Sequence, residues 1–156
     1  MAKPLLLIDI DGVLRPTVFT PSRGYDIYYL KGRKVYLSEQ MGGEVLALAS
    51  DFELVWATGW EDQANELIAP ILGLPSLPVI HFNRALDKIA GITGFVGDRP
   101  LVWWDDWVEE GEAEWVRQRN LHTPTKLIRI NHLSGLMPQD FAATRCFAQN
   151  LRTPND

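Results

Sequence analysis

The stretch LLLIDIDG, residues 5–12, decides the fold of this chain. Its apolar run is continuous, which is typical of a strand buried on both faces of a parallel sheet. The run is followed by two carboxylates, Asp9 and Asp11, and by a glycine that favours a turn. Residues 5–10 are therefore predicted to form a central strand with acidic side chains at its carboxyl end.

Apolar runs and helical patterns alternate along the rest of the chain. Strands are expected at residues 5–10, 52–57, 78–82, 101–104 and 126–130. Helices are expected from Ser38 onward and at residues 61–69, 84–90, 109–119 and 139–151, and a hairpin at residues 25–30 and 33–38. This order predicts an α/β fold: a Rossmann-like core with a five-stranded, mainly parallel sheet and helices on both faces, in a single domain over residues 1–156.

Length and composition limit the possible classes of protein. The chain has 156 residues, 46% of them hydrophobic, and a formal net charge of −5. That length buries a sufficient core without disulfides, and the negative charge gives no bulk attraction to nucleic acid or anionic lipid. The one cysteine, Cys146, forms no internal disulfide, and no apolar run is long enough to span a membrane. A cytoplasmic protein without membrane partners is expected.

Polar side chains gather at the carboxyl ends of the predicted strands. They are Asp9, Asp11, Thr58, Asp105 and Asp106, and Lys88 lies on the helix before the fourth strand. Carboxylates that meet at one edge of a sheet repel one another and need a cation. A set of oxygen ligands with open water positions suits Mg²⁺ best, so Mg²⁺ is the expected cofactor.

Four segments, in order, carry a family resemblance. They are LLIDIDGV at residues 6–13, VWATG at residues 55–59, Lys88, and LVWWDD at residues 101–106. Together they resemble the four motifs of the haloacid dehalogenase (HAD) superfamily of phosphatases. The chain is also similar to small bacterial HAD domains found in RNA-repair proteins. The resemblance implies a HAD-type core and a Mg²⁺-dependent phosphomonoester hydrolase.

The resemblance assigns a role to each catalytic position. Asp9 would be the nucleophile that forms an aspartyl-phosphate, and Asp11 the general acid and then the general base. The Thr58 hydroxyl and backbone N–H groups such as that of Gly59 would bind the phosphoryl oxygens, and Lys88, with Arg84 as the alternative, would supply countercharge.

The same resemblance places the metal on Asp9, on Asp11 through its backbone carbonyl, and on Asp105 or Asp106. The residue at position 11 also distinguishes phosphatases from the other enzymes of the superfamily. Asp11 offers the proton that an alkoxide leaving group needs, whereas family dehalogenases lack an acid there. The transport ATPases of the superfamily carry threonine at this position and need membrane helices, which this sequence does not predict. The resemblance therefore does not extend to that activity.

The intervals between the motifs leave little room for a cap domain. Residues 14–38 suffice only for a hairpin flap, so the predicted active site is open to bulky phosphate esters. The flap region is basic and could guide an anionic substrate, although solvated hairpin charges explain it equally well; its cations are Arg15, Arg23, Lys31, Arg33 and Lys34. Trp60 and Trp107 each follow a motif closely and are candidates for the substrate entrance.

Several substrates and one other class of protein stay open from the sequence. A nucleotide or nucleic-acid end is the first phosphorylated substrate to test, and a small metabolite is the alternative. A phospho-accepting receiver domain also groups acids, threonine and lysine around Mg²⁺, but receivers carry their paired acids after the first strand, whereas here the pair follows the fourth. A binding module on a HAD fold is the remaining non-enzymatic reading.

Overall fold

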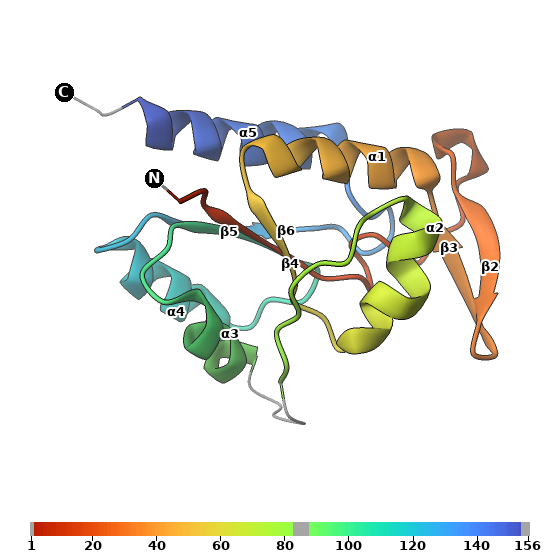
Figure 1. Ribbon diagram of the computed structural model, residues 1–156, viewed down its shortest axis with the longest axis horizontal. Coiled ribbons are helices and arrows are strands. Elements are labelled where there is room, and N and C mark those ends of the chain that lie inside the picture. The colour runs from red at the N-terminus through yellow and green to blue at the C-terminus, as the bar shows by residue number, and fades with distance from the viewer. Residues whose placement is uncertain (1, 83–87, 154–156) are drawn as a thin grey trace.

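A four-stranded parallel sheet forms the centre of the protein (Figure 1). The computed structural model describes residues 2–82 and 88–153. The strand order is β4-β1-β5-β6, with β1 at Leu5–Ile8, β4 at Glu53–Trp56, β5 at Leu101–Asp105 and β6 at Thr125–Arg129. The predicted parallel α/β fold is confirmed, and residues 5–8 lie at its centre.

The register of the sheet aligns the carboxyl ends of three neighbouring strands. Ile8 of β1 lies beside Trp56 of β4 on one side and Trp104 of β5 on the other. The residues that directly follow these three therefore meet at one edge of the sheet, which is where ligands bind in open α/β sheets.

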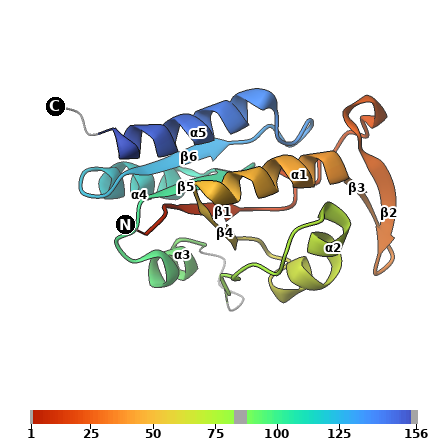
Figure 2. The same cartoon turned by 45° about the horizontal axis from the view of Figure 1, so that its top comes forward.

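Helices cover both faces of the sheet (Figure 2). On one face lie α1 (Glu39–Ala47), α2 (Ala69–Leu72) and α5 (Pro138–Arg152); on the other lie α3 (Lys88–Val96) and α4 (Glu110–Asn120). Successive residues of β1 point to opposite faces, so Leu6 and Ile8 join one buried cluster while Leu5 and Leu7 join the other. Both faces of β1 are fully buried, as its continuous apolar run predicts.

The predicted hairpin forms a separate two-stranded antiparallel sheet at one end of the molecule (Figure 1). It consists of β2 (Asp26–Leu30) and β3 (Arg33–Leu37). Lys31 and Gly32 both adopt positive φ angles, of 49° and 75°, which close the two-residue turn between the strands.

The predicted third strand, residues 78–82, is wrong as a full strand. Only an isolated bridge between Val79 and Trp56 forms there, through N–H donation from Trp56 to Pro78 and from Ile80 to Trp56. Pro78 has no N–H of its own, which limits the ladder that this segment can form. The described sheet therefore has four strands, not the five that were predicted.

Two helices differ from their predicted bounds. The helix predicted at residues 61–69 does not end before Pro70, because a π-helical segment, Ala64–Ile68, leads directly into α2. The wider turn lets the Ala69 N–H reach the carbonyl of Ala64, five residues back, just before the proline that has no N–H to give. The helix predicted at residues 84–90 lies partly outside the described residues; its described part begins at Lys88 and continues to Val96.

Short 3₁₀ segments occur at Pro21–Arg23 and Leu48–Ser50. Among the described helices, none combines the length and apolar character that a membrane crossing requires.

Candidate active site

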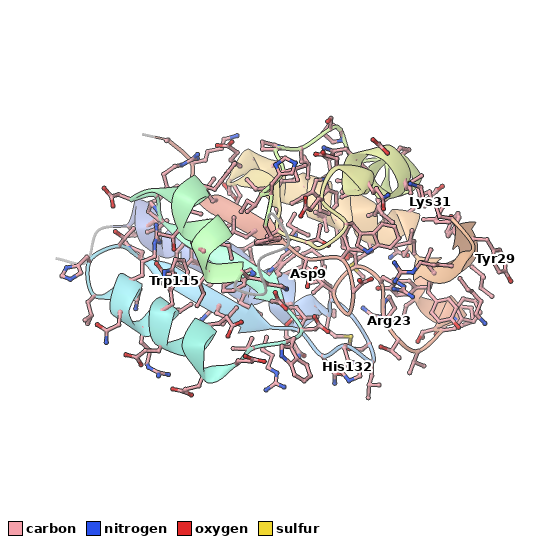
Figure 3. All side chains as sticks on the ribbon, turned by 90° about the horizontal axis from the view of Figure 1, so that it is seen from below. Asp9, Arg23, Tyr29, Lys31, Trp115 and His132 are labelled. Carbon is pink, nitrogen blue, oxygen red and sulfur yellow. The ribbon has the colours of Figure 1, made fainter. Side chains whose placement is uncertain are left out.

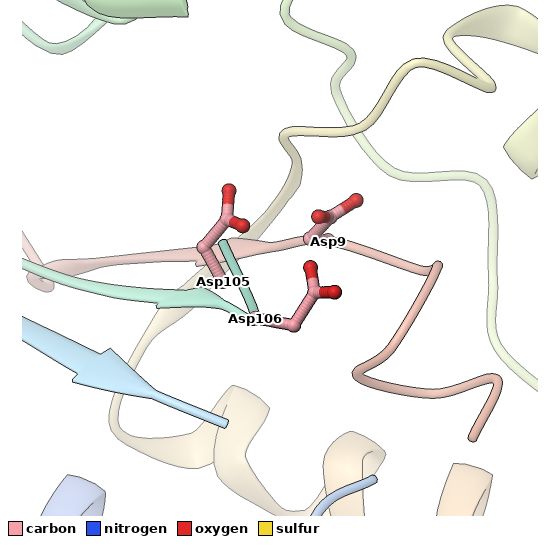
Figure 4. Close-up of side chains that lie close together, drawn as sticks. All are labelled: Asp9, Asp105 and Asp106. Atoms are coloured by element: carbon pink, nitrogen blue, oxygen red, sulfur yellow. The ribbon is translucent and has the colours of Figure 1, made fainter. Parts of the chain in front are cut away.

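Three carboxylates meet at the carboxyl ends of β1 and β5 (Figure 4). Asp9 directly follows β1, Asp105 is the last residue of β5, and Asp106 comes next. Each offers an oxygen, and these oxygens all lie within 4.8 Å of one another. Asp9 and Asp105 are buried, so the protein concentrates negative charge in a place that water screens poorly.

Lys88 is the cation that faces this group. Its Nζ lies 2.7 Å from Oδ2 of Asp105 and 3.5 Å from Oδ2 of Asp9. It is the first described residue of α3, which packs against the sheet from the opposite face to α1. The structure thus brings together Asp9, Asp105, Asp106 and Lys88, all of them predicted from the sequence.

The electrostatics of the group show that one positive charge does not balance it. Burial and the neighbouring carboxylates Asp105 and Asp106 raise the pKa of Asp9 to about 8, despite the opposing effects of Lys88 and the Ile10 N–H. Burial and Asp105 also raise the pKa of Asp106. Burial alone would lower the pKa of Lys88, but Asp9 and Asp105 outweigh it and raise that pKa. Without a further cation, Asp9 holds a proton at neutral pH.

The two neighbouring aspartates of β5 differ in what their oxygens already bind. Oδ2 of Asp105 accepts from Lys88, and its Oδ1 accepts from the backbone N–H of Trp107 at 2.9 Å. Asp106 is partly exposed and borders two surface hollows. Asp106 is therefore better placed than Asp105 to offer oxygens to a metal, together with Asp9.

Gly12 makes room for Asp106. Its φ of 78° is in the region that favours glycine, and a side-chain carbon added to it would overlap the carboxylate of Asp106. Gly12, predicted from the sequence only as a turn residue, is thus also required because a larger side chain would collide with Asp106.

Thr58 lies at the same edge, just beyond the end of β4. Its side chain is buried, and its Oγ1 accepts from the backbone N–H of Trp60 at 3.2 Å. Its hydroxyl hydrogen is still available to donate. Gly59 is exposed, and nothing lies within 4 Å of the position that a side chain would occupy there.

The carboxylate of Asp11 lies apart from the other three. Among the described residues it is not part of the close group, and Oδ1 of Asp11 instead accepts from Arg15 at 2.8 Å and from the indole N–H of Trp60 at 3.2 Å. The side chain of Asp11 is about half exposed, at 52%. This placement leaves only the backbone carbonyl of Asp11 for the predicted metal contact.

Sequence reasoning missed these two partners of Asp11. Trp60 is buried and donates to Asp11, and Arg15 donates both to Asp11 and to the backbone carbonyl of Lys34 in the hairpin. Side chains four residues apart face each other on a helix, but Asp11 and Arg15 were not predicted to lie on one, so their spacing gave little reason to expect an ion pair. Trp60 follows its motif by one residue, but nothing in the sequence indicates a contact with Asp11.

The hairpin lies next to this edge of the sheet (Figure 3). The guanidinium of Arg33 lies over the ring of Trp60, 5.1 Å from its centre. In the view of Figure 3, Asp9 is near the middle, and the hairpin with Tyr29 and Lys31 projects to one side. Trp107, the other candidate for the entrance, is 67% exposed and follows the carboxylates directly.

Comparison of the chain with family models, curated proteins and solved structures found no match.

Proposed function

We propose that this protein is a Mg²⁺-dependent phosphomonoester hydrolase that works through an aspartyl-phosphate. One observation carries the proposal: three carboxylates and Lys88 converge where the parallel strands β1 and β5 end. The resemblance of the four motifs to those of HAD phosphatases supports the same reading, because each motif contributes at least one residue to this edge of the sheet.

The donor set fits a Mg²⁺ ion. All three close side chains are carboxylates, and burial together with mutual repulsion raises the pKa of Asp9 to about 8. A hard cation with oxygen ligands relieves that repulsion. Asp9 and Asp106 would hold the ion with the backbone carbonyl of Asp11, and Asp105 would stay with Lys88. When bound, Mg²⁺ neutralises charge on the phosphoryl oxygens and keeps Asp9 deprotonated.

Asp9 is the proposed nucleophile. Oδ1 of Asp9 accepts the N–H of Ile10 at 2.8 Å, which fixes the carboxylate, while Oδ2 faces Lys88. An oxygen of Asp9 forms a bond to phosphorus as the bond from phosphorus to the ester oxygen breaks. Water then attacks the phosphorus of the aspartyl-phosphate, which releases inorganic phosphate and restores the Asp9 carboxylate.

Asp11 is the proposed acid and base. It gives a proton to the departing ester oxygen and later takes one from the attacking water. Arg15 and Trp60 hold its Oδ1 and leave Oδ2 without a partner among the described residues. The proton that Asp11 gives in the first step is replaced by the one it takes from water in the second, so the group returns to its starting form at the end of the cycle.

Thr58 and Lys88 position the phosphoryl group. The Thr58 hydroxyl can donate to a phosphoryl oxygen while it still accepts from Trp60. Lys88 lies between Asp9 and Asp105 and reduces the repulsion between Asp9 and an incoming dianion.

The substrate class follows from the open edge of the sheet. Among the described residues, the insertion between β1 and α1 is a small hairpin and not a cap domain. Bulky esters such as nucleotides and phosphorylated nucleic-acid ends can therefore approach, and they come first in a substrate panel. A small phosphorylated metabolite is the alternative.

Phosphate release from a generic aryl phosphate tests the proposal. We expect turnover that depends on Mg²⁺ and that Asp9→Asn lowers by at least about a thousandfold, because the mutant amide cannot form the acyl phosphate. Asp62→Asn, the same change at an exposed position, is the matched control and keeps full activity. Equal turnover by wild type and Asp9→Asn would refute the mechanism.

A further inference from the structure

A hollow of about 320 Å³ opens beside the carboxylates, on the side of the hairpin. Asp11, Gly12 and Asp106 line its inner wall, and Lys34 and Tyr36 of β3 line the wall toward the hairpin. Asp11 and Asp106 already belong to the proposed mechanism, whereas the lining residues Lys34, Tyr36 and His132 have no role in it.

Lys34 is a cation of this hollow without an ion pair among the described residues. Arg15, also in the lining, is paired with Asp11, and Arg33 lies over Trp60. Arg23 donates to the backbone carbonyl of Leu136. The ammonium group of Lys34 has no ion pair or hydrogen bond among the described residues, and it lies over the ring of Tyr36, 5.9 Å from the ring centre. Its charge is therefore available to a ligand.

Other residues around the hollow add further donors. His132 lines the hollow and shares a hydrogen bond of 3.0 Å with Thr17, so one ring nitrogen is engaged and the other is free of described partners. A second hollow, of about 280 Å³, shares Asp106 and His132 with the first and is lined by Arg129 at the end of β6. Arg129 likewise has no ion pair among the described residues. Each of the two hollows that Asp106 borders is thus also lined by a cation.

We propose, on the basis of the proposed function, that this hollow binds a second anionic group of the substrate, held by Lys34 and His132 while the reacting phosphoryl group lies at Asp9. Negative charge in the lining does not oppose this. Asp11 is paired with Arg15, and Asp106 is one of the residues proposed above to hold the metal. The substrate is then a phosphomonoester with a second phosphate or a phosphodiester, and Tyr36 offers an aromatic surface beside it.

Equilibrium binding to the Asp9→Asn protein in Mg²⁺ tests this without turnover. The probes are adenosine 5′-monophosphate, adenosine 3′,5′-bisphosphate and a 5′-phosphorylated dinucleotide, measured by titration calorimetry. We expect a probe with a second charge to bind about fivefold more tightly than the monophosphate, as one partly exposed charge contact gives. The bisphosphate and dinucleotide arms show whether a terminal phosphate or a phosphodiester is preferred.

Lys34→Gln removes this preference, whereas Lys31→Gln keeps it. Both changes remove one positive charge from the hairpin, but Lys31 is in the turn and does not line the hollow (Figure 3). Equal preference in the two variants, or no preference in the parent protein, overturns the proposal. Phosphate release from the aryl phosphate is measured separately, so failure of the second-anion site and failure of the proposed hydrolase are distinguished.

Discussion

Asp9 is the residue whose protonation depends most on its surroundings. Burial, Asp105 and Asp106 raise its pKa to about 8, whereas an aspartate in an unfolded chain titrates near 4. The folded protein therefore holds this proton more tightly than the unfolded chain does. The stability that this proton contributes is complete below about pH 4 and is lost as the pH rises toward 8.

We predict that metal-free protein becomes less stable than its Asp9→Asn variant as the pH rises from 5.5 to 7.5. The difference in free energy of unfolding should fall by at most about 1.4 kcal/mol per pH unit, the limit for one proton. Urea unfolding of both proteins in a chelator measures it, and comparison with the variant cancels the other titrating groups. Mg²⁺ should remove the slope, because a bound cation keeps Asp9 deprotonated. A pH-independent difference in the chelator would contradict the assignment.

Gly12 controls where the carboxylate of Asp106 can lie. We predict that Gly12→Ala raises the Mg²⁺ concentration needed for half-maximal activity by more than about tenfold, because the new methyl group displaces an oxygen ligand. A Mg²⁺ titration of phosphate release measures it.

Gly32→Ala is the matched control for that change. Its φ of 75° is close to the 78° of Gly12, but nothing lies within 4 Å of the added carbon. Backbone strain costs both variants about 1 kcal/mol of stability, and the overlap with Asp106 adds a further cost in Gly12→Ala alone. An equal shift in Mg²⁺ dependence in both would mean that strain, and not Asp106, is responsible.

At the scale of the elements, the loop after β4 and the hairpin meet at Trp60. Its indole donates to Asp11, and its ring contacts Arg33. The loop thus joins the proposed acid to the segment that lines the second-anion hollow.

We predict that Trp60→Phe lowers kcat for the aryl phosphate about tenfold and changes KM little, because the ring still supports Arg33 while Asp11 loses a donor that orients it. Steady-state kinetics measure both constants. Trp115→Phe, in α4 on the other face of the sheet, is the control and keeps wild-type kcat. A rise in KM with unchanged kcat would assign Trp60 to substrate binding instead.

At the scale of the whole molecule, a buried polar contact joins the sheet to α5. The indole N–H of Trp104 donates to Oγ1 of Thr144 at 3.0 Å, and Thr144 donates to the carbonyl of Asp140. We predict that Thr144→Val costs about 1–3 kcal/mol, since it leaves a buried N–H without a partner. Urea unfolding measures it, and Thr153→Val at the exposed end of the helix costs less than about 0.5 kcal/mol. Equal losses would show that Trp104 finds another acceptor.

The sequence predicted most of this architecture because local signals agreed with the global fold. The apolar run of β1 and the acids that follow it indicated both the central strand and the carboxylate group. The strand predicted around Val79 is reduced to an isolated bridge, because Pro78 lacks the N–H that a longer ladder needs. The contact between Trp60 and Asp11 joins residues 49 apart in the chain, and no periodicity encodes such a pair.

The central position of β1 has a consequence for how the chain is made. Residues 5–8 pair with residues 53–56 on one side and with residues 101–104 on the other. During synthesis this apolar segment leaves the ribosome long before its second partner strand has been made. Until then one edge of the strand is unpaired, and other chains could pair with it. Co-translational protection by a chaperone would matter most in that interval, and nascent chains stopped between residues 60 and 100 should be the most prone to aggregate.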